Sequence, residues 1–235
     1  MAKIKNIIFD FGGVLYDVRY ENIAEAFESH GITNIGEFYT RTFQTPEIDR
    51  FEMGLMSPAE FHDYVRKASG HPASDAVIDE IMNAILIDMP AQRVELLLKL
   101  RAKYKVILFS NTNQIHYDCF YDHLLKKFNF DIFPTCFDAC YFSHTMHMRK
   151  PNTDGFRRIL KEQGLVPNET LFIDDNAPNL EGAREVGIHG YHLCDKDVCD
   201  LFDEDLNFIQ EVKNSCRRKL YKKQSFSNTR RWTRK

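Results

Sequence analysis

The sequence predicts an α/β fold in which a doubly wound parallel sheet carries an inserted all-helical segment. Short apolar runs rich in β-branched and aromatic residues alternate with helical periodicity from about residue 91 onward. This alternation is typical of a parallel sheet with helices on both faces. A further apolar run at about residues 4–9 is separated from the others by a stretch with helical patterning. That stretch is therefore expected to be an insertion after the first strand.

The inserted stretch contains three recognisable helices. Apolar residues at Ile23, Ala24 and Phe27 predict the first, which Gly31 is expected to end. The sequence Ser57-Pro58-Ala59-Glu60 has the form of a capping box with proline at the first helical position, and it opens the second. Residues 76–87 supply the third. We expect no strands between about residues 18 and 88.

The remaining elements follow in order along the chain. Helices are predicted at 91–103, 115–127, 152–164 and 177–187, and strands at 105–110, 139–143, 170–174 and 190–194. The chain is thus divided into a core (1–17 and 89–212), a helical cap (18–88) and a C-terminal tail (213–235).

Composition favours a globular protein in a reducing compartment. With 235 residues, 43% hydrophobic and 28% charged, the chain is long enough for a sizeable core. No apolar run approaches the length of a membrane span, and no apolar leader follows Met1. The six cysteines form no CxxC pair, so free thiols and a cytoplasmic location are expected.

A zinc site is an alternative use of two of these cysteines. Cys136 and Cys140 are followed closely by His144 and His147. The spacing matches no standard zinc finger, and structural zinc needs four closed tetrahedral ligands. Zinc binding is therefore not expected.

The net charge of −3 conceals a basic tail. Residues 213–235 contain ten of the 31 lysines and arginines and no acid. Residues 1–212 contain the other 21 lysines and arginines and all 34 acidic residues, so they carry a net charge of −13. Such a tail could contact nucleic acid or an anionic surface, or be a disordered terminus that docks on the acidic body. Nucleic-acid binding is not expected, because the chain has no recognisable module for it.

Polar groups follow three of the predicted strands. Asp10 follows the run 7–9, Ser110 follows 106–109, and Asp174 and Asp175 follow 171–173. In an open α/β sheet, ligands bind just beyond the carboxyl ends of such strands. These side chains are therefore expected to form one site. Lys150, in the segment Arg-Lys-Pro, is a candidate to join it.

The four segments and their order resemble the haloacid dehalogenase superfamily, in its phosphatase branch with a helical cap. The resemblance covers roughly residues 4–195, and it is closest to the sugar-phosphate phosphatases that open with Asp-x-Gly-[Gly/Asn]-Val. It implies a Rossmann-like core and Mg²⁺-dependent hydrolysis of a small phosphate monoester. Asp10 would be the nucleophile that forms an aspartyl-phosphate, which divides one difficult displacement into two steps.

The resemblance also implies roles for the other site residues. Asp10, Asp175 and the Gly12 carbonyl would hold Mg²⁺, a hard cation that takes oxygen ligands, with Asp174 as an outer or alternate ligand. Ser110 and Lys150 match the second and third motifs, a hydroxyl donor and a cation for the phosphate. Asn111 and Gly13 would contact the substrate. Asn179 would orient the acids that bind the metal. Taken singly, each has an ordinary structural interpretation as a turn residue or a solvated charge.

One position departs from the family pattern. Most phosphatases of this superfamily carry an aspartate two residues after the nucleophile as general acid and base, and this chain has Gly12 there. Glycine cannot transfer a proton, and general acid–base help is typically worth about 10²–10⁴ in rate. Asp17 is the candidate replacement, although it could equally cap a helix or face solvent.

The same gap keeps two other functions open. A degenerate protein could retain metal and phosphate binding without catalysis, or a 2-haloacid dehalogenase could act without proton transfer to a halide. The paired acids Asp174 and Asp175 favour the phosphatase. Cap residues that could recognise sugar hydroxyls or a second anionic group are Arg19, Tyr20, Tyr39, Arg41 and Arg50. The substrate is expected to be a small phosphorylated metabolite, and the sequence leaves the oligomeric state open.

Overall fold

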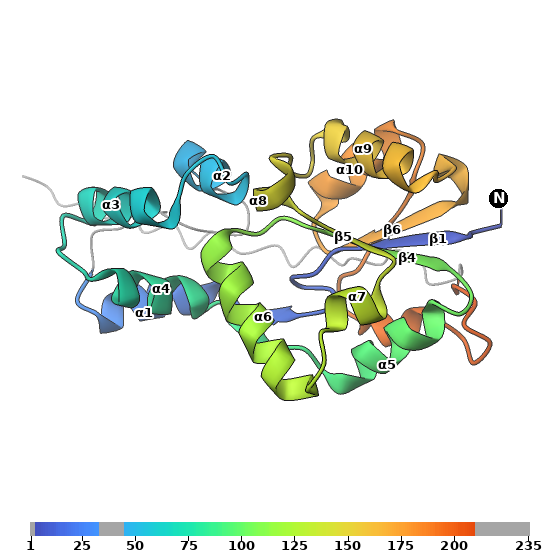
Figure 1. The fold of residues 1–235 in the computed structure, drawn as a ribbon, viewed down its shortest axis with the longest axis horizontal. Helices are drawn as coiled ribbons and strands as arrows, with labels where there is room; N and C mark the ends of the chain where they lie inside the picture. Colours follow the sequence, from blue (N-terminus) through green and yellow to red (C-terminus); the bar gives the residue numbers. More distant parts are fainter. Residues whose placement is uncertain (1–2, 33–44, 210–235) are drawn as a thin grey trace, which may run out of the picture.

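The structure, a computed structural model, describes residues 3–32 and 45–209. Its centre is a parallel five-stranded sheet in the order β5-β4-β1-β6-β7 (Figure 1). The strands are β1 (Asn6–Phe9), β4 (Lys105–Ser110), β5 (Ala139–Phe142), β6 (Thr170–Asp174) and β7 (His189–His192). From β1 the chain builds outward to β4 and β5 on one side and then crosses to β6 and β7 on the other. The carboxyl end of β1 is thus the point where the strand order reverses, which is where open α/β sheets bind ligands.

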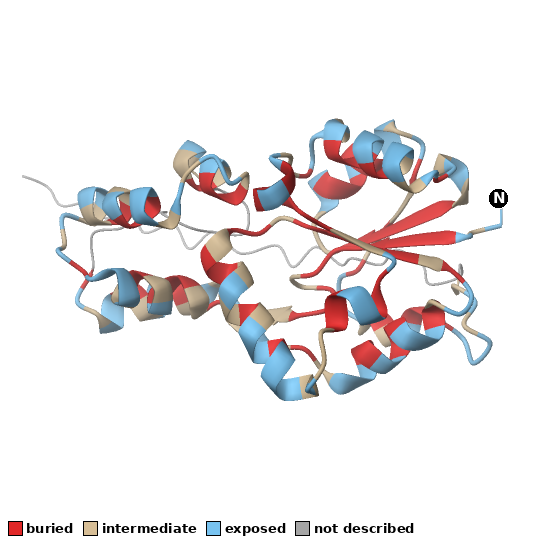
Figure 2. Ribbon diagram, in the orientation of Figure 1, coloured by how far each residue is buried: buried red, intermediate tan, exposed pale blue. Residues whose placement is uncertain are grey.

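The sheet strands are apolar on both sides because both of their faces are covered. Successive side chains of a strand point to opposite faces, and those of β1 divide accordingly. Ile7 and Phe9 belong to one apolar cluster and Ile8 to another, all three without exposed surface. Figure 2 shows the central strands as mostly buried, and β1 and β6 are buried at every residue. Burial on both faces is the pattern of a parallel sheet between helices.

The helices of the core lie in two layers. One face of the sheet is covered by α5 (Ala91–Leu100), α6 (Gln114–Phe128) and α7 (Ile132–Cys136). The opposite face is covered by α9 (Thr153–Gln163) and α10 (Ala177–Glu185), above the sheet in Figure 1. Short helical turns complete the core: α8 (Ser143–Met146), η1 (Pro167–Glu169) and η2 (Val198–Leu201). The predicted doubly wound α/β class is confirmed.

Residues 18–32 and 45–88, which we call the helical insert, lie beside the carboxyl end of the sheet (Figure 1). The helices are α1 (Glu21–Ser29), α2 (Pro46–Glu52), α3 (Pro58–Ser69) and α4 (Asp75–Asn83). They enclose an apolar cluster of their own, in which the rings of Phe51 and Phe61 stack with centroids 4.1 Å apart. Ile115 of α6 joins this cluster from the core. The capping box predicted at Ser57 and Glu60 is present at the start of α3.

The insert is attached to the core by two short strands, and this corrects the prediction. β2 (Asp17–Val18) and β3 (Leu86–Asp88) pair antiparallel, where no strand was expected and where a helix was predicted over 76–87. Helix α4 ends at Asn83 because the chain must reach Leu86 to pair with Val18. Ile85 continues the helical spacing of apolar residues, which explains the overlong prediction.

Several smaller predictions are corrected in the same way. Helices α2 and α7 were not expected, and Ser143 begins α8 rather than ending the strand before it. Cys194 forms a disulfide bond, so the expectation of free thiols is wrong for this residue, whereas four other described cysteines are free. The tail 213–235, Tyr39 and Arg41 lie outside the described residues.

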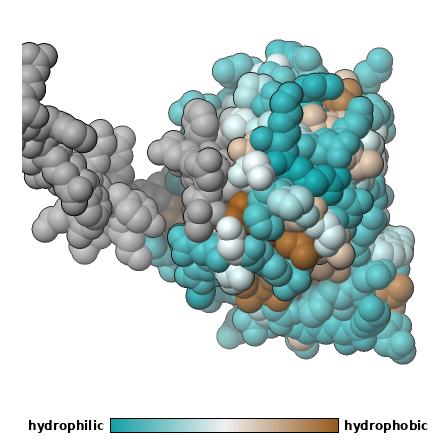
Figure 3. Space-filling view, turned by 90° about the vertical axis from the view of Figure 1, so that its left-hand side faces the viewer, coloured by the Kyte–Doolittle hydropathy of each residue, from teal (hydrophilic) through white to brown (hydrophobic). Residues whose placement is uncertain are grey.

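In the described part of the chain, no helix is both long and apolar enough to cross a membrane. Figure 3 shows the face that carries the helical insert, and its described surface is mainly hydrophilic with separate apolar spots. Scattered apolar residues of this kind are normal on a protein surface.

Candidate active site

The predicted site residues meet at the carboxyl edge of the sheet. Asp10 follows β1, Ser110 ends β4, and Asp174 ends β6. Strand β1 pairs with both β4 and β6, with Phe9 opposite Leu108 and Ile173. The three strand ends are therefore adjacent, as the sequence predicts.

Lys150 lies at the centre of this group. Its Nζ atom is 2.8 Å from Oδ1 of Asp10 and 2.8 Å from Oδ2 of Asp174. The lysine is 1% exposed, and its ammonium also lies over the rings of Phe109 and Phe172. A buried ammonium is stable only when it is paired, and here it has two carboxylate partners.

The surroundings shift the titration of this pair. Burial raises the pKa of Asp10 well above its ordinary value; Lys150 opposes the rise, while Asp174 and Asp175 add to it. Burial lowers the pKa of Lys150, but the Asp10 and Asp174 carboxylates outweigh burial, so the pKa lies above its ordinary value. Lys150 therefore remains a cation at neutral pH.

Three carboxylates gather where a cation could bind. Within the described residues, the oxygens of Asp10, Asp174 and Asp175 lie within 4.8 Å of one another and form the group that could hold a metal ion. Hard divalent cations take carboxylate oxygens as ligands, so this donor set fits Mg²⁺. The cysteines and histidines considered for zinc form no such group in the same part of the chain.

The two adjacent aspartates have different surroundings. Asp174 is fully buried, and both of its oxygens accept hydrogen bonds. The donors are Nζ of Lys150 (2.8 Å), Nδ2 of Asn179 (3.0 and 3.2 Å) and the backbone N–H of Asn176 (2.7 Å). Asp175 is only partly buried. Asn179 thus fixes the carboxylate of Asp174, whereas the role of Asp175 as the direct ligand stays a prediction.

Gly13 provides the space that Asp175 occupies. A Cβ atom built on Gly13 would lie 2.3 Å from Oδ2 of Asp175, and φ of Gly13 is +78°. Both the close approach and the left-handed backbone favour glycine. Gly12 differs, because a Cβ there would meet Val18 at 3.6 Å, an ordinary contact distance.

Asn111 contacts Lys150 rather than open space. Its Nδ2 donates to the carbonyl of Lys150 at 3.0 Å, and its Oδ1 accepts from the backbone N–H of Lys150 at 2.9 Å. The contact of Asn111 with substrate stays a prediction, whereas its two hydrogen bonds to the backbone of Lys150 are present in the structure. Ser110, the residue before Asn111, is buried, and its Oγ lies 3.4 Å from the Asn111 carbonyl oxygen.

Asp17, the candidate general acid, is bound to an arginine. Nη1 of Arg93 lies 2.7 Å from Oδ1 of Asp17, and the same guanidinium binds Asp197 and the Leu15 carbonyl. Asp17 thus has a structural contact beside any role in proton transfer. Its catalytic role stays a prediction.

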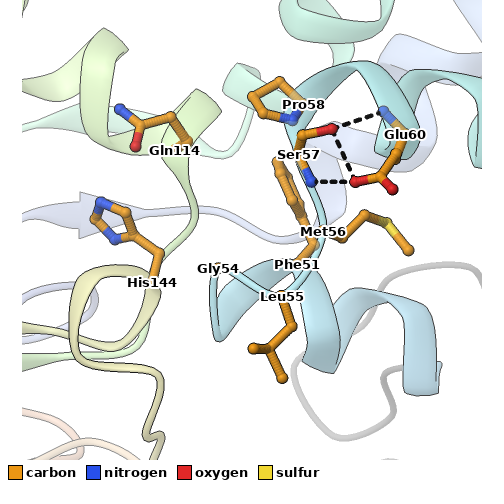
Figure 4. Close-up of a pocket in the computed structure, with 9 residues that line it drawn as sticks. All are labelled: Phe51, Gly54, Leu55, Met56, Ser57, Pro58, Glu60, Gln114 and His144. Carbon is orange, nitrogen blue, oxygen red and sulfur yellow. Dashed lines mark hydrogen bonds between the residues drawn. The ribbon is translucent and has the colours of Figure 1, made fainter.

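A pocket of about 430 Å³ lies between the insert and the core (Figure 4). Its residues are Phe51, Gly54, Leu55, Met56, Ser57, Pro58, Glu60, Gln114 and His144. Ser57 and Glu60 already bond to each other, and Gln114 donates to Asp118 at 2.7 Å. Much of the remaining lining is apolar. None of the strand-end site residues lines this pocket; its two core residues, Gln114 and His144, lie on the segments that follow β4 and β5.

The candidate specificity residues of the insert are placed as follows. Arg19 is exposed, Tyr20 packs against the apolar cluster of the insert, and Arg50 reaches the carbonyl of Leu55 at 3.4 Å. The roles of these three residues in recognition stay predictions.

Sequence reasoning missed three residues that support the site. Ser143 is fully buried and joins the core to α2, because its Oγ bonds to Thr112 and to the carbonyl of Glu52. Arg149 pairs with acids of α2. Asn113 caps the N-terminus of α6. Among these residues it is the one whose role could have been read from the sequence, because asparagine is a preferred N-cap residue.

Comparison with known proteins supports the same interpretation. Residues 4–187 match the family of haloacid dehalogenase-like hydrolases. A D-ribitol-5-phosphate phosphatase of Bacteroides thetaiotaomicron is 27% identical over 80% of this chain and 91% of its own length. The sesquiterpene phosphatase astK of Aspergillus oryzae is 26% identical over 81% of this chain and 90% of its own.

A solved structure is also similar. It is a haloacid dehalogenase family enzyme of Bacteroides thetaiotaomicron, crystallised as a variant with magnesium and inorganic phosphate. It is 37% identical with a TM-score of 0.81, and the match covers 86% of this chain and all of that one. From the family match and this likeness in fold, together with the strand-end site, the chain belongs to the haloacid dehalogenase-like hydrolases, and curated relatives along most of its length are phosphatases.

Proposed function

We propose that the protein is a Mg²⁺-dependent phosphatase that hydrolyses a small phosphate monoester through an aspartyl-phosphate on Asp10. The observation that carries the proposal is the buried arrangement of Asp10, Lys150 and the two aspartates after β6 at one edge of the sheet. The phosphatase relatives support it. Bound Mg²⁺ would supply positive charge to the phosphate and to the nucleophile.

The side chains of the site divide the work. The Asp10 carboxylate attacks phosphorus, and the bond to the leaving oxygen breaks; water then hydrolyses the acyl phosphate. Lys150 holds Asp10 at 2.8 Å and offsets negative charge at the reacting atoms. Ser110 would donate its hydroxyl to a phosphate oxygen. Asp10, Asp175 and the Gly12 carbonyl would hold the metal, with Asp174 behind them.

The substrate is proposed to be a sugar phosphate, a polyol phosphate or a related metabolite. The D-ribitol-5-phosphate phosphatase favours this class, whereas another relative, 26% identical, is a sesquiterpene phosphatase. Both classes therefore belong in the first assay. A cytoplasmic location stays a prediction.

Phosphate release with Mg²⁺, and with chelator in its place, tests the proposal. The panel comprises D-ribitol 5-phosphate, other sugar phosphates, a sesquiterpenyl phosphate and p-nitrophenyl phosphate. We expect release that chelator abolishes and Mg²⁺ restores. No release from any ester by protein that still binds Mg²⁺ and phosphate would indicate the degenerate binder. Halide release from a 2-haloacid without metal would indicate the dehalogenase.

A further inference from the structure

Arg149, the residue before the buried lysine, is paired with the helical insert. Its Nη2 lies 2.9 Å from Oε2 of Glu52, and its Nη1 binds Oδ1 of Asp49. Both acids belong to α2. The guanidinium thus joins the backbone that carries Lys150 to a helix about 100 residues earlier in the chain.

This ion pair is largely shielded from water. Glu52 is 3% exposed as a residue, and the Arg149 side chain is 20% exposed. A buried carboxylate without a cation is costly, so Glu52 and Arg149 stabilise each other's positions. An exposed pair would be worth little, whereas this one resists displacement of α2.

The end of α2 is fitted closely to the same stretch of the core. The Ser143 hydroxyl donates to the Glu52 carbonyl at 2.6 Å, and Nδ1 of His147 lies 2.8 Å from the Met53 carbonyl. A Cβ on Gly54 would lie 2.0 Å from the His144 carbonyl oxygen. The chain from Ser143 to Arg149 therefore contacts α2 at several points in succession.

Lys150 is held from the other side by the core. Asn111 bonds to both the N–H and the carbonyl of Lys150. The backbone around Lys150 is thus fixed by two contacts: Asn111, in the loop after β4, bonds to Lys150 itself, and Arg149, the preceding residue, pairs with α2. The Lys150 side chain extends from this backbone to Asp10 and Asp174.

We propose that Arg149 is a positioning residue that makes the placement of the catalytic lysine depend on the docking of α2. When α2 is docked, Arg149 and Asn111 fix the backbone of Lys150 so that its ammonium meets Asp10. When α2 is displaced, one of these two anchors is lost. The effect on catalysis rests on the proposed function, whereas the effect on the order of the Lys150 segment does not.

The test compares Arg149→Met with a matched control, Arg66→Met. Arg66 also pairs with two acids, Asp63 and Asp75, each at 2.7 Å, but all three lie inside the insert. We expect Arg149→Met to lower kcat for phosphate release at least about tenfold with a smaller change in KM. Arg66→Met should leave kcat within about twofold. Arg149→Lys should recover part of the loss, because a single ammonium can still pair with Glu52.

A double-mutant cycle and amide exchange complete the test. Glu52→Gln should also lower kcat, and the double variant with Arg149→Met should be no slower than Arg149→Met alone, since both remove one interaction. Hydrogen exchange of residues 147–153 should become at least about tenfold faster in Arg149→Met and remain unchanged in Arg66→Met.

The outcomes separate this proposal from the phosphatase proposal. If the wild type releases no phosphate, the function is wrong, and the exchange measurement still decides the role of Arg149. Unchanged exchange and a kcat within twofold of wild type would overturn the positioning role. Equal losses in the Arg149 and Arg66 variants would overturn it too, because they would show general destabilisation.

Discussion

The Nζ atom of Lys150 lies 2.8 Å from Oδ1 of Asp10, and both residues are more than nine-tenths buried. With Asp174 and Asp175 beside them, one ammonium faces three carboxylates. Such a site repels an anionic phosphate until a further cation is bound. This excess of negative charge supports the proposed binding of a divalent ion.

Asp10→Asn should reduce phosphate release to background. The amide has nearly the same shape as the carboxylate but cannot attack phosphorus, so the fold should persist. Initial rates and thermal unfolding measure the two effects. Asp154→Asn, at an exposed position on α9, is the control and should stay active. An Asp10→Asn enzyme with most of its activity would remove Asp10 as the nucleophile.

Gly13→Ala should weaken Mg²⁺ binding at least about tenfold. The methyl group would overlap Oδ2 of Asp175 and displace this carboxylate. Gly164→Ala is the matched control, because φ is +63° there but nothing lies within 4 Å of the new Cβ. Both variants should lose about 1–2 kcal/mol of stability from the left-handed backbone. Calorimetric titration with Mg²⁺ should distinguish them, and equal affinities would contradict the role of Asp175.

Gly12→Asp should raise kcat, by about tenfold or more if proton transfer limits turnover. The site accepts a Cβ at ordinary contact distance from Val18, and the new carboxyl would stand where most relatives of this superfamily are expected to have one. Gly12→Asn has the same size without the acid and should not gain. If the Gly12→Asp enzyme is slower than the wild type, the absence of a general acid at position 12 does not limit turnover.

Asp17→Asn tests the alternative source of the proton. If Asp17 serves as general acid, kcat should fall at least about tenfold. If its contact with Arg93 is purely structural, only the unfolding temperature should fall. Asp197→Asn removes the other acid bound to Arg93 and is the control for loss of the ion pair. A lower kcat in both variants would point to Arg93 rather than to Asp17.

Stability should fall in acid because of His116. Burial lowers the pKa of His116 to about 4, although the Met82 carbonyl, 3.0 Å away, partly opposes the shift. Between about pH 6.5 and 4 the unfolded chain binds a proton here that the folded chain does not. Folding stability therefore decreases as pH falls through this window, by about 3 kcal/mol at its lower end.

His116→Gln should remove this part of the acid sensitivity. Urea unfolding at pH 7 and at pH 4.5 gives the free energy of unfolding at each pH. The loss of free energy between the two pH values should be smaller in the variant than in the wild type. His123→Gln, at an exposed helix position, is the control. A variant as acid-sensitive as the wild type would assign the loss to other groups.

The strand-end residues were predictable because their signal is local. Each of Asp10, Ser110 and Asp174 directly follows a run of apolar residues, and parallel strands place their carboxyl ends at one edge. The capping box of α3 is local as well. The sequence therefore predicts the sheet, its helices and the side chains that lie beside Asp10.

The contacts that were missed join residues far apart in the chain. β2 and β3 are two and three residues long, too short for a periodic pattern, and they form only because they pair with each other. The partners of Arg149 lie 97 and 100 positions earlier, and Arg93 meets Asp17 across 76. No periodicity encodes such pairs, since tertiary packing brings them together.

The pairing of β2 with β3 also bears on how such a chain can be rebuilt. Val18 and Leu86 lie opposite each other on antiparallel strands, so the polypeptide leaves the core and returns to it within about 5 Å. A two-residue hairpin turn spans that gap. The two ends of the segment 19–85 thus lie side by side, so a replacement segment with equally close ends could be joined to the same two strands, but it would have to supply an acidic partner for Arg149 to keep the backbone of Lys150 in place.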